Sequence, residues 1–163
     1  MLSNFTPAHT ARVLRWIFAG LFVIAAMWAL SFFFIIGFNM TDSLPGYAYM
    51  VITYHRPAKH ELVAFRPPPN DFYRHGWFIK YVKGVPGDVV RWDGRRFAIN
   101  GHPLGSAKLR SEHGIALDRG AGGRIPQNNY FVWSEHVDSF DSRYGQIDLV
   151  PRDRIIGRAY RLF

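Results

Sequence analysis

The chain has 163 residues, a formal net charge of +8 at pH 7 and no cysteine, which excludes a disulfide framework, a thiol nucleophile and a cysteine-based zinc site. Its aromatic content of 17% and its many Val, Ile and Phe residues are typical of a folded, β-rich domain rather than a disordered chain. The basic residues are scattered and form no recognition motif, so we expect a solvated basic surface and no nucleic-acid partner.

The N-terminal part predicts a membrane anchor. Residues 1–15 form a short polar tail that contains Arg12 and Arg15 but no acidic residue, and residues 16–38 carry no charge. As a helix, residues 16–38 would span about 34 Å, which is enough for a bilayer core. A cleaved signal peptide would have a shorter apolar region and a small-residue cleavage site. We therefore predict a retained transmembrane anchor with a cytoplasmic N-terminus, and an extracytoplasmic domain that is periplasmic in a Gram-negative cell.

Residues 39–163 predict one mainly β domain, either a barrel or a sandwich. Asp93-Gly94 and Asn100-Gly101 are typical of hairpin turns. Residues 101–124 have weak periodicity and are predicted to form a loop. Short strands separated by frequent turns favour an all-β fold. Aromatic and β-branched runs predict strands at residues 47–54, 61–65, 77–82, 89–92, 97–99, 130–134 and 155–162.

Two hydroxyl side chains, Thr41 and Ser43, follow the apolar run and precede the turn-forming pair Pro45-Gly46. If this backbone is extended, both side chains point to the same side. A nucleophile and a hydrogen-bond donor would then face the same reacting carbonyl. A juxtamembrane linker has a similar composition, so this stretch does not decide between the two interpretations by itself.

A serine nucleophile needs a base. His136 with Asp138 or Asp141 could form a Ser-His-Asp triad, but no Gly-x-Ser-x-Gly elbow surrounds Ser43. His60-Glu61 begins like a His-Glu-x-x-His zinc helix, but the second histidine is absent. We therefore predict no metal and no organic cofactor.

Lysine is the third candidate base. The chain has four lysines, and Lys80 lies within the apolar strand predicted at residues 77–82. Burial lowers the pKa of a lysine, and a neutral lysine can act as a general base. Lowering that pKa from about 10.4 to near 7 takes about 4.6 kcal/mol. An edge-strand lysine with its ammonium group in solvent is the alternative.

Four segments in order resemble the conserved boxes of the type I signal peptidases, peptidase family S26. Ser43-Leu44-Pro45 resembles the serine box, and residues 60–65 resemble the strand box that follows it. Residues 78–88 resemble the lysine box, and residues 139–159 contain the C-terminal box. Within the family, the chain looks most like the conjugative-transfer TraF-type peptidases, whose Asn-x-Thr-x-Ser-x-Pro pattern matches residues 39–45.

The resemblance implies a signal-peptidase-like β fold and a serine protease with a Ser–Lys dyad. Ser43 would attack the scissile carbonyl, and neutral Lys80 would take its proton and later protonate the leaving amine. The oxyanion hole would consist of the backbone N–H of Ser43 and the hydroxyl of Thr41.

The resemblance also implies supporting residues. Ser139 would orient the lysine, and Asp141 and Arg143 would hold the site together. A turn with a surface ion pair is the alternative for this segment. The chain departs from the family at Tyr81, where an Arg is usual, and at residues 133–136, which replace Gly-Asp-Asn-Arg.

The family binds its substrate as an added strand beside the segments that lead to the serine and the lysine. This implies substrate contacts at Leu44, Pro45, Phe78 and Ile79, with small pockets that accept residues such as Ala. A site next to the bilayer suits a membrane-tethered precursor as partner.

Together, these features predict a membrane-anchored serine endopeptidase that matures, or cyclises, a conjugative pilin. A general signal peptidase and a non-enzymatic scaffold of a secretion apparatus are the alternatives.

Overall fold

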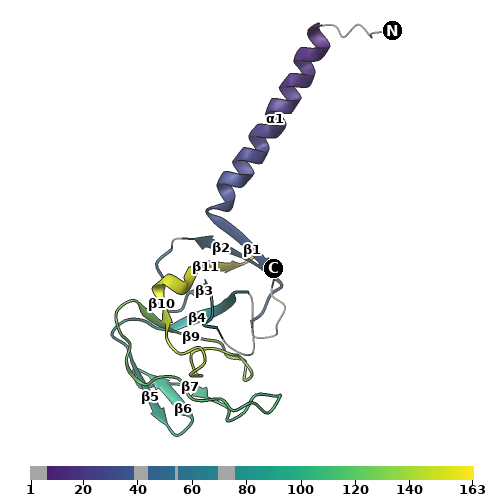
Figure 1. Cartoon of the computed structure of the whole chain (residues 1–163). Coiled ribbons are helices and arrows are strands. Elements are labelled where there is room, and N and C mark those ends of the chain that lie inside the picture. Colours follow the sequence, from purple (N-terminus) through teal and green to yellow (C-terminus); the bar gives the residue numbers. More distant parts are fainter. Residues whose placement is uncertain (1–6, 39–43, 54, 70–75) are drawn as a thin grey trace.

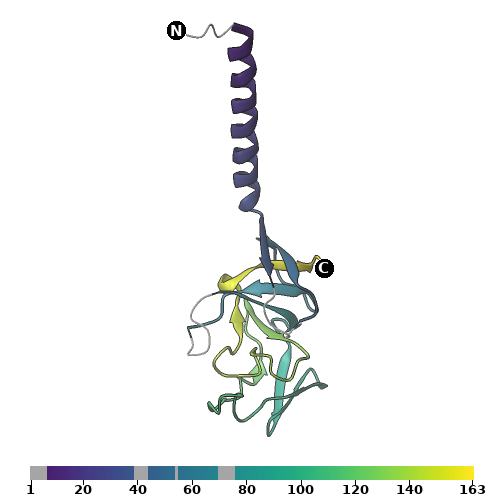
Figure 2. The ribbon, with the colours of Figure 1, turned by 90° about the vertical axis from the view of Figure 1, so that its right-hand side faces the viewer.

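The computed structural model describes residues 7–38, 44–53, 55–69 and 76–163. One long helix, α1 (Pro7–Ser31), projects from a β-rich body (Figure 1). The body contains two sheets, and the view in Figure 2 shows that the helix contacts the body only at its C-terminal end. The expected mainly β fold with one N-terminal apolar helix is therefore confirmed.

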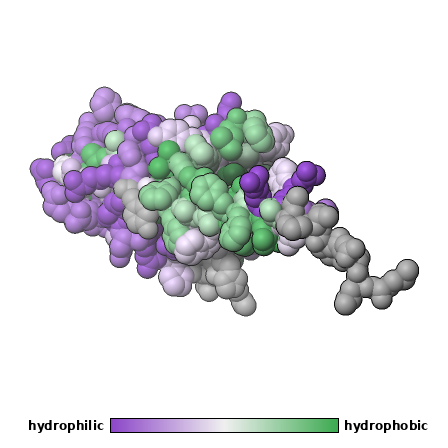
Figure 3. Space-filling model, turned by 90° about the horizontal axis from the view of Figure 1, so that it is seen from above, coloured by the Kyte–Doolittle hydropathy of each residue, from purple (hydrophilic) through white to green (hydrophobic). Residues whose placement is uncertain are grey.

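The segment His9–Ser31 of α1 is long and apolar enough to cross a bilayer and contains an 18-residue stretch with a mean hydropathy of 2.0. Its large hydrophobic side chains are exposed all around the helix. Seen from above, the helix presents a largely hydrophobic surface, whereas the body is largely hydrophilic (Figure 3). A helix with no polar face is stable in lipid rather than in water.

The predicted helical anchor is wrong at its C-terminal end. The helix stops at Ser31, and β1 (Phe34–Phe38) pairs antiparallel with β2 (Ala48–Thr53). Aromatic and β-branched residues favour a strand, and pairing satisfies their backbone hydrogen bonds where the chain meets the body. The change from helix to strand could not be predicted from the sequence, because the apolar run is uninterrupted and hydropathy does not distinguish a helix from a strand.

The larger sheet has seven strands in the order β1-β2-β11-β3-β4-β9-β10, and all of its pairs are antiparallel. The smaller sheet has the order β7-β6-β5-β8 and lies further from the helix (Figure 1). The strands not yet given are β3 (Leu62–Phe65), β4 (Phe78–Gly84), β5 (Val89–Asp93), β6 (Arg96–Ile99), β7 (His102–Ser106), β8 (Gly123–Arg124), β9 (Asn129–Trp133), β10 (Val150–Pro151) and β11 (Ile155–Arg161), and a 3₁₀ turn, Arg152–Arg154, precedes β11.

The two faces of the larger sheet belong to different core clusters. One cluster includes Val63 and Val82, and the other includes Ala64 together with Leu44. Because successive side chains in a strand point to opposite faces, Lys80 shares the face of Val82, which is two residues further along β4. The central lysine of β4 is thus directed toward an apolar core.

Both predicted hairpins are present, although the first turn consists of Gly94 and Arg95, because Asp93 still pairs with Arg96. Asn100 and Gly101 connect β6 to β7 with φ of 51° and 81°, the left-handed conformations that a tight hairpin requires. Residues 101–124, however, are not simply a loop, because they contain β7 and β8. Pro103 and Gly105 weaken the strand pattern of β7, and Pro is tolerated there because β7 is an edge strand.

The segment between β7 and β8 packs against the loop that connects β9 to β10. Arg119 forms an isolated bridge with Tyr144, and the Gly120 N–H donates to the Arg143 carbonyl at 2.9 Å. The Gly145 N–H donates to the Asp118 carbonyl, also at 2.9 Å. Residues 118–120, which connect two strands of the smaller sheet, therefore support residues 143–145 of the C-terminal box.

Candidate active site

Lys80 is buried in the middle of β4. Only 5% of the residue is exposed, and its strand pairs with β3 through Val63. Burial lowers the pKa of Lys80 to about 8; the nearby Asp141 carboxylate partly opposes this shift, and Arg143 adds to it. A substantial fraction of this amine is therefore neutral at mildly alkaline pH, as a general base requires.

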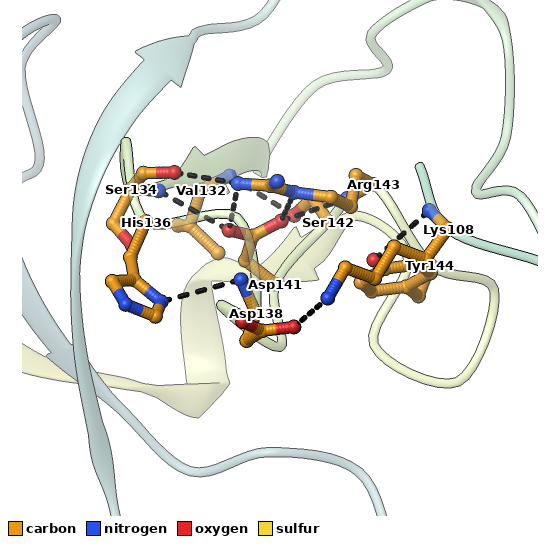
Figure 4. Close-up of polar contacts among 9 residues, drawn as sticks. All are labelled: Lys108, Val132, Ser134, His136, Asp138, Asp141, Ser142, Arg143 and Tyr144. Atoms are coloured by element: carbon orange, nitrogen blue, oxygen red, sulfur yellow. Dashed lines mark hydrogen bonds and ion pairs between the residues drawn. The ribbon is translucent and has the colours of Figure 1, made fainter. Parts of the chain in front are cut away.

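Asp141 and Arg143 form a buried bidentate ion pair (Figure 4). The Arg143 Nε and Nη2 atoms donate to the two oxygens of Asp141 at 2.8 and 3.0 Å. Asp141 also accepts the backbone N–H groups of Arg143 and Ser134. Each charge is thus satisfied by its partner and by the backbone, which a buried pair requires. The alternative of a surface ion pair is wrong, because neither residue is exposed.

The same loop is fastened to β9. The Ser142 hydroxyl accepts the Val132 N–H at 3.0 Å, and the Ser142 N–H donates to the Val132 carbonyl. The Ser134 carbonyl accepts Nη2 of Arg143. These bonds fix the position of the ion pair next to the strand that carries Lys80, because β9 is the neighbour of β4.

Ser139 is almost completely buried. Its hydroxyl has no hydrogen-bond partner among the described residues, while its N–H donates to the His136 carbonyl. A buried hydroxyl without a partner costs free energy and often marks a functional position. This hydroxyl is available to an amine or a reacting group.

Thr41 and Ser43, the predicted oxyanion donor and nucleophile, lie outside the described residues. The described chain resumes at Leu44, which is buried against Tyr49 and Val51 of β2. Pro45 follows at the surface.

The predicted substrate contacts divide between the two core clusters. Ile79 packs against the cluster that contains Leu44. Phe78 instead contacts Phe65, with ring centroids 5.9 Å apart and the rings at 89°. The structure thus brings Leu44 and Ile79 together, whereas Phe78 supports the core on which Lys80 lies.

The residues of the two alternatives, a Ser-His-Asp triad and a metal site, pair with other groups. Nδ1 of the exposed His136 accepts the N–H of Asp138, and the Asp138 carboxylate pairs with Lys108 (Figure 4). Glu61 pairs with His55 and Arg158. Across the ranges that the structure describes, no three His, Asp or Glu side chains are grouped closely enough to hold a metal.

Tyr81 and Trp133, two of the residues that differ from the family pattern, form an aromatic pair that the sequence did not predict. Tyr81 and Trp133 are cross-strand neighbours, and Nζ of Lys83 lies 5.5 and 5.3 Å from their ring centroids. The Arg143 guanidinium lies 5.6 Å from the Trp133 centroid. Such contacts contribute about 0.5–2 kcal/mol each. The adjacent aromatic residues in β4 and β9 were visible in the sequence, but the pairing of these strands was not.

Comparisons with known proteins identify the family of the chain. The profile of the family described as signal peptidase, peptidase S26, matches residues 10–163. A conjugal transfer protein TraF from Agrobacterium fabrum is 31% identical over 144 residues, which cover 77% of this chain and 80% of that protein. A signal peptidase I from Pseudomonas fluorescens is 30% identical over 164 residues, which cover 77% of this chain and 56% of that protein.

A probable signal peptidase I-2 from Synechocystis is 31% identical over 116 residues, which cover 66% of this chain and 48% of that protein. This chain thus spans about half the length of these signal peptidases. A crystal structure of a signal peptidase I from Enterococcus faecalis V583 aligns with a TM-score of 0.41 and 21% identity, covering 64% of this chain and 97% of that chain. On the family profile and the relatives, the chain belongs to the signal peptidase family, peptidase S26, and is a membrane-anchored serine endopeptidase.

Proposed function

We propose that the protein cleaves its substrate with a Ser43–Lys80 dyad. The observation that carries this proposal is the buried Lys80, whose pKa of about 8 makes it a base at mildly alkaline pH. Ser43 attacks the scissile carbonyl while Lys80 removes the hydroxyl proton, which gives a tetrahedral intermediate. That intermediate collapses to an ester on Ser43 as Lys80 protonates the departing amine.

We further propose roles for the supporting residues. Thr41 and the Ser43 N–H stabilise the oxyanion. The buried Ser139 hydroxyl, which has no hydrogen-bond partner among the described residues, orients the Lys80 amine during the reaction. The Asp141–Arg143 pair keeps the loop that carries Ser139 in place. Leu44 and Ile79 line the substrate strand, and Pro45 and Phe78 flank it.

We propose that the substrate is a conjugative pilin precursor. The TraF relative supports this assignment, since the match covers 80% of that protein and so extends over most of both chains. The acyl-enzyme ester can be resolved by water, which gives a linear product, or by the substrate's own amine, which gives a ring. A general signal peptidase is the second candidate, and the identity to the signal peptidase of Pseudomonas fluorescens favours it.

The proposed location follows from the anchor. Arg12 and Arg15 precede the apolar part of α1, so the N-terminus faces the cytoplasm and the β body lies outside, next to the bilayer. In a Gram-negative cell this places the body in the periplasm, on the outer face of the inner membrane. A precursor that is still tethered to the bilayer would then reach Ser43 without leaving the membrane.

The experiment is the intact mass of the pilin from cells with wild-type, Ser43→Ala or Lys80→Ala protein. We expect both variants to accumulate in the membrane and to leave the precursor unprocessed. A wild-type product lighter by one water than the linear peptide indicates cyclisation, and the full linear mass indicates hydrolysis. Normal processing by both variants would contradict the dyad. Processing of unrelated preproteins at equal rates would favour the general signal peptidase.

A further inference from the structure

The turn that follows Ser43 is held at several points by residues outside the proposed machinery. Leu44 is the first described residue after Ser43, and its side chain is buried in a cluster with Tyr49 of β2. Pro45 comes next, with φ restricted by its ring. Few rotatable bonds therefore separate the Pro45 carbonyl from the backbone of Ser43.

Tyr49 holds this carbonyl from inside the body. Its hydroxyl donates a hydrogen bond to the Pro45 carbonyl oxygen. Only 1% of Tyr49 is exposed, so its ring is fixed by the core while its hydroxyl reaches the turn. A tyrosine has two side-chain dihedral angles, so packing of the ring leaves the hydroxyl little freedom.

The C-terminal segment of β11 holds the other side of the turn. Gly46 has a φ of 106°, and an added Cβ there would lie 2.5 Å from Cδ of Arg161. The next N–H, that of Tyr47, donates to the Phe163 carbonyl at 2.8 Å. The turn is thus enclosed between the Tyr49 hydroxyl and the side chain of Arg161.

We propose that Tyr49 is a positioning residue that sets the orientation of the Ser43 nucleophile through the Pro45 carbonyl. This inference rests on the proposed role of Ser43. The Ser43 N–H is also the proposed oxyanion donor, so a rotation of this turn would displace both the attacking oxygen and the donor. A displacement of about 1 Å in such an arrangement can cost about 100-fold in rate.

The hydrogen bond persists under the conditions in which the base is active. Burial and the neighbouring Tyr81 raise the pKa of Tyr49, while Arg161 acts in the opposite direction. The Tyr49 hydroxyl therefore keeps its proton in the pH range where Lys80, with a pKa of about 8, becomes neutral.

The test uses the full chain in detergent micelles and the p-nitrophenyl ester of an N-acetylated Ala-Leu-Ala tripeptide. Tyr49→Phe removes the donor but keeps the ring. We expect kcat to fall about 10-fold to 100-fold, with KM changed by less than about twofold and little change in Tm. Tyr130→Phe is the matched control, because it removes a hydroxyl from a buried tyrosine in the other core cluster. This control should retain the wild-type kcat.

Arg161→Ala is a second variant that changes an exposed side chain and therefore leaves the core intact. It should lower kcat less than Tyr49→Phe does. Wild-type kcat in both variants would overturn the inference while leaving the dyad standing, provided that Ser43→Ala is inactive. If Ser43→Ala hydrolyses the ester as fast as the wild type, the proposed function itself fails. A parallel rise in KM and loss of Tm in Tyr49→Phe would mean that the residue is only structural.

Discussion

The two sheets shift the pKa of a lysine in opposite directions. In the larger sheet, Lys80 is buried, and burial lowers the pKa of its amine to about 8. Beside the smaller sheet, Lys108 pairs with Asp138 at the surface, and this partner raises the lysine pKa. A lysine amine is thus more easily deprotonated in the larger sheet, and its protonated form is stabilised beside the smaller sheet. Burial next to an already paired carboxylate distinguishes the two.

Substitution of Lys80 should give the largest effect. Lys80→Met keeps the volume but removes the base, so we expect a loss of at least about 10³-fold in kcat, the scale of a missing general base. The same substitution should raise the stability of the folded protein at pH 7. Lowering a pKa from 10.5 to about 8 costs the folded state about 3 kcal/mol below pH 8.

That penalty disappears between pH 8 and 10.5, where the amine becomes neutral in both the folded and the unfolded state. Lys80→Met should therefore unfold at a higher denaturant concentration than the wild type at pH 7, and the difference should narrow by pH 10.5. Chemical denaturation at both pH values measures this. A variant that is less stable at pH 7 would show that Lys80 is a favourable buried cation.

Breaking the buried ion pair should have the next largest effect. Asp141→Asn leaves the Arg143 guanidinium buried without its carboxylate, and we expect a loss of about 3–5 kcal/mol in unfolding free energy. The Asp141 carboxylate also raises the pKa of Lys80. Any residual activity of the variant should therefore have its acid limb at lower pH than the wild type. An acid limb shifted to higher pH would contradict this electrostatic assignment.

A smaller effect should follow from a change that lies between the two sheets. In Gly120→Ala the added Cβ would lie 2.2 Å from the Ser142 carbonyl oxygen, within the loop that carries the ion pair. The backbone must shift, and we expect a loss of about 1–3 kcal/mol, as for other overpacked positions, with a matching loss of activity. Gly114→Ala is the control: its left-handed φ of 78° disfavours alanine, but among the described residues no heavy atom lies within 4 Å of the added Cβ. Equal activity in both variants would show that segment 118–120 does not support the site.

The smallest effect should come from Lys108. Lys108→Met removes the surface pair with Asp138, which lies on the same loop as Asp141 (Figure 4). We expect an unchanged kcat and an unchanged pH profile, because exposed pairs contribute little. Steady-state kinetics from pH 6 to 10 measure this. A shift in the profile would mean that the surface charges of this loop also tune Lys80.

Seven of the eleven strands that the structure describes and both hairpins could be predicted from the sequence, whereas β1, β7, β8 and β10 were missed. Asn100-Gly101 specifies its turn directly, whereas an edge-strand lysine fitted the pattern around Lys80 as well as a buried one did. The end of α1 could not be located, because an apolar run looks the same in a helix in lipid and in a paired strand. The brace between residues 118–120 and 143–145 is a long-range contact of irregular backbone and leaves no periodic signal.

The most direct test of the central claim is the pKa of the Lys80 amine, measured by NMR titration of the lysine ¹³Cε signals in full-length Ser43→Ala protein in detergent. The chain has only four lysines, Lys59, Lys80, Lys83 and Lys108, so substitution of each assigns its signal. We expect Lys80 to titrate near pH 8, and Lys108 to titrate above the usual range of a lysine. A Lys80 pKa of 10 or higher would leave the amine protonated at physiological pH and would contradict its role as the base.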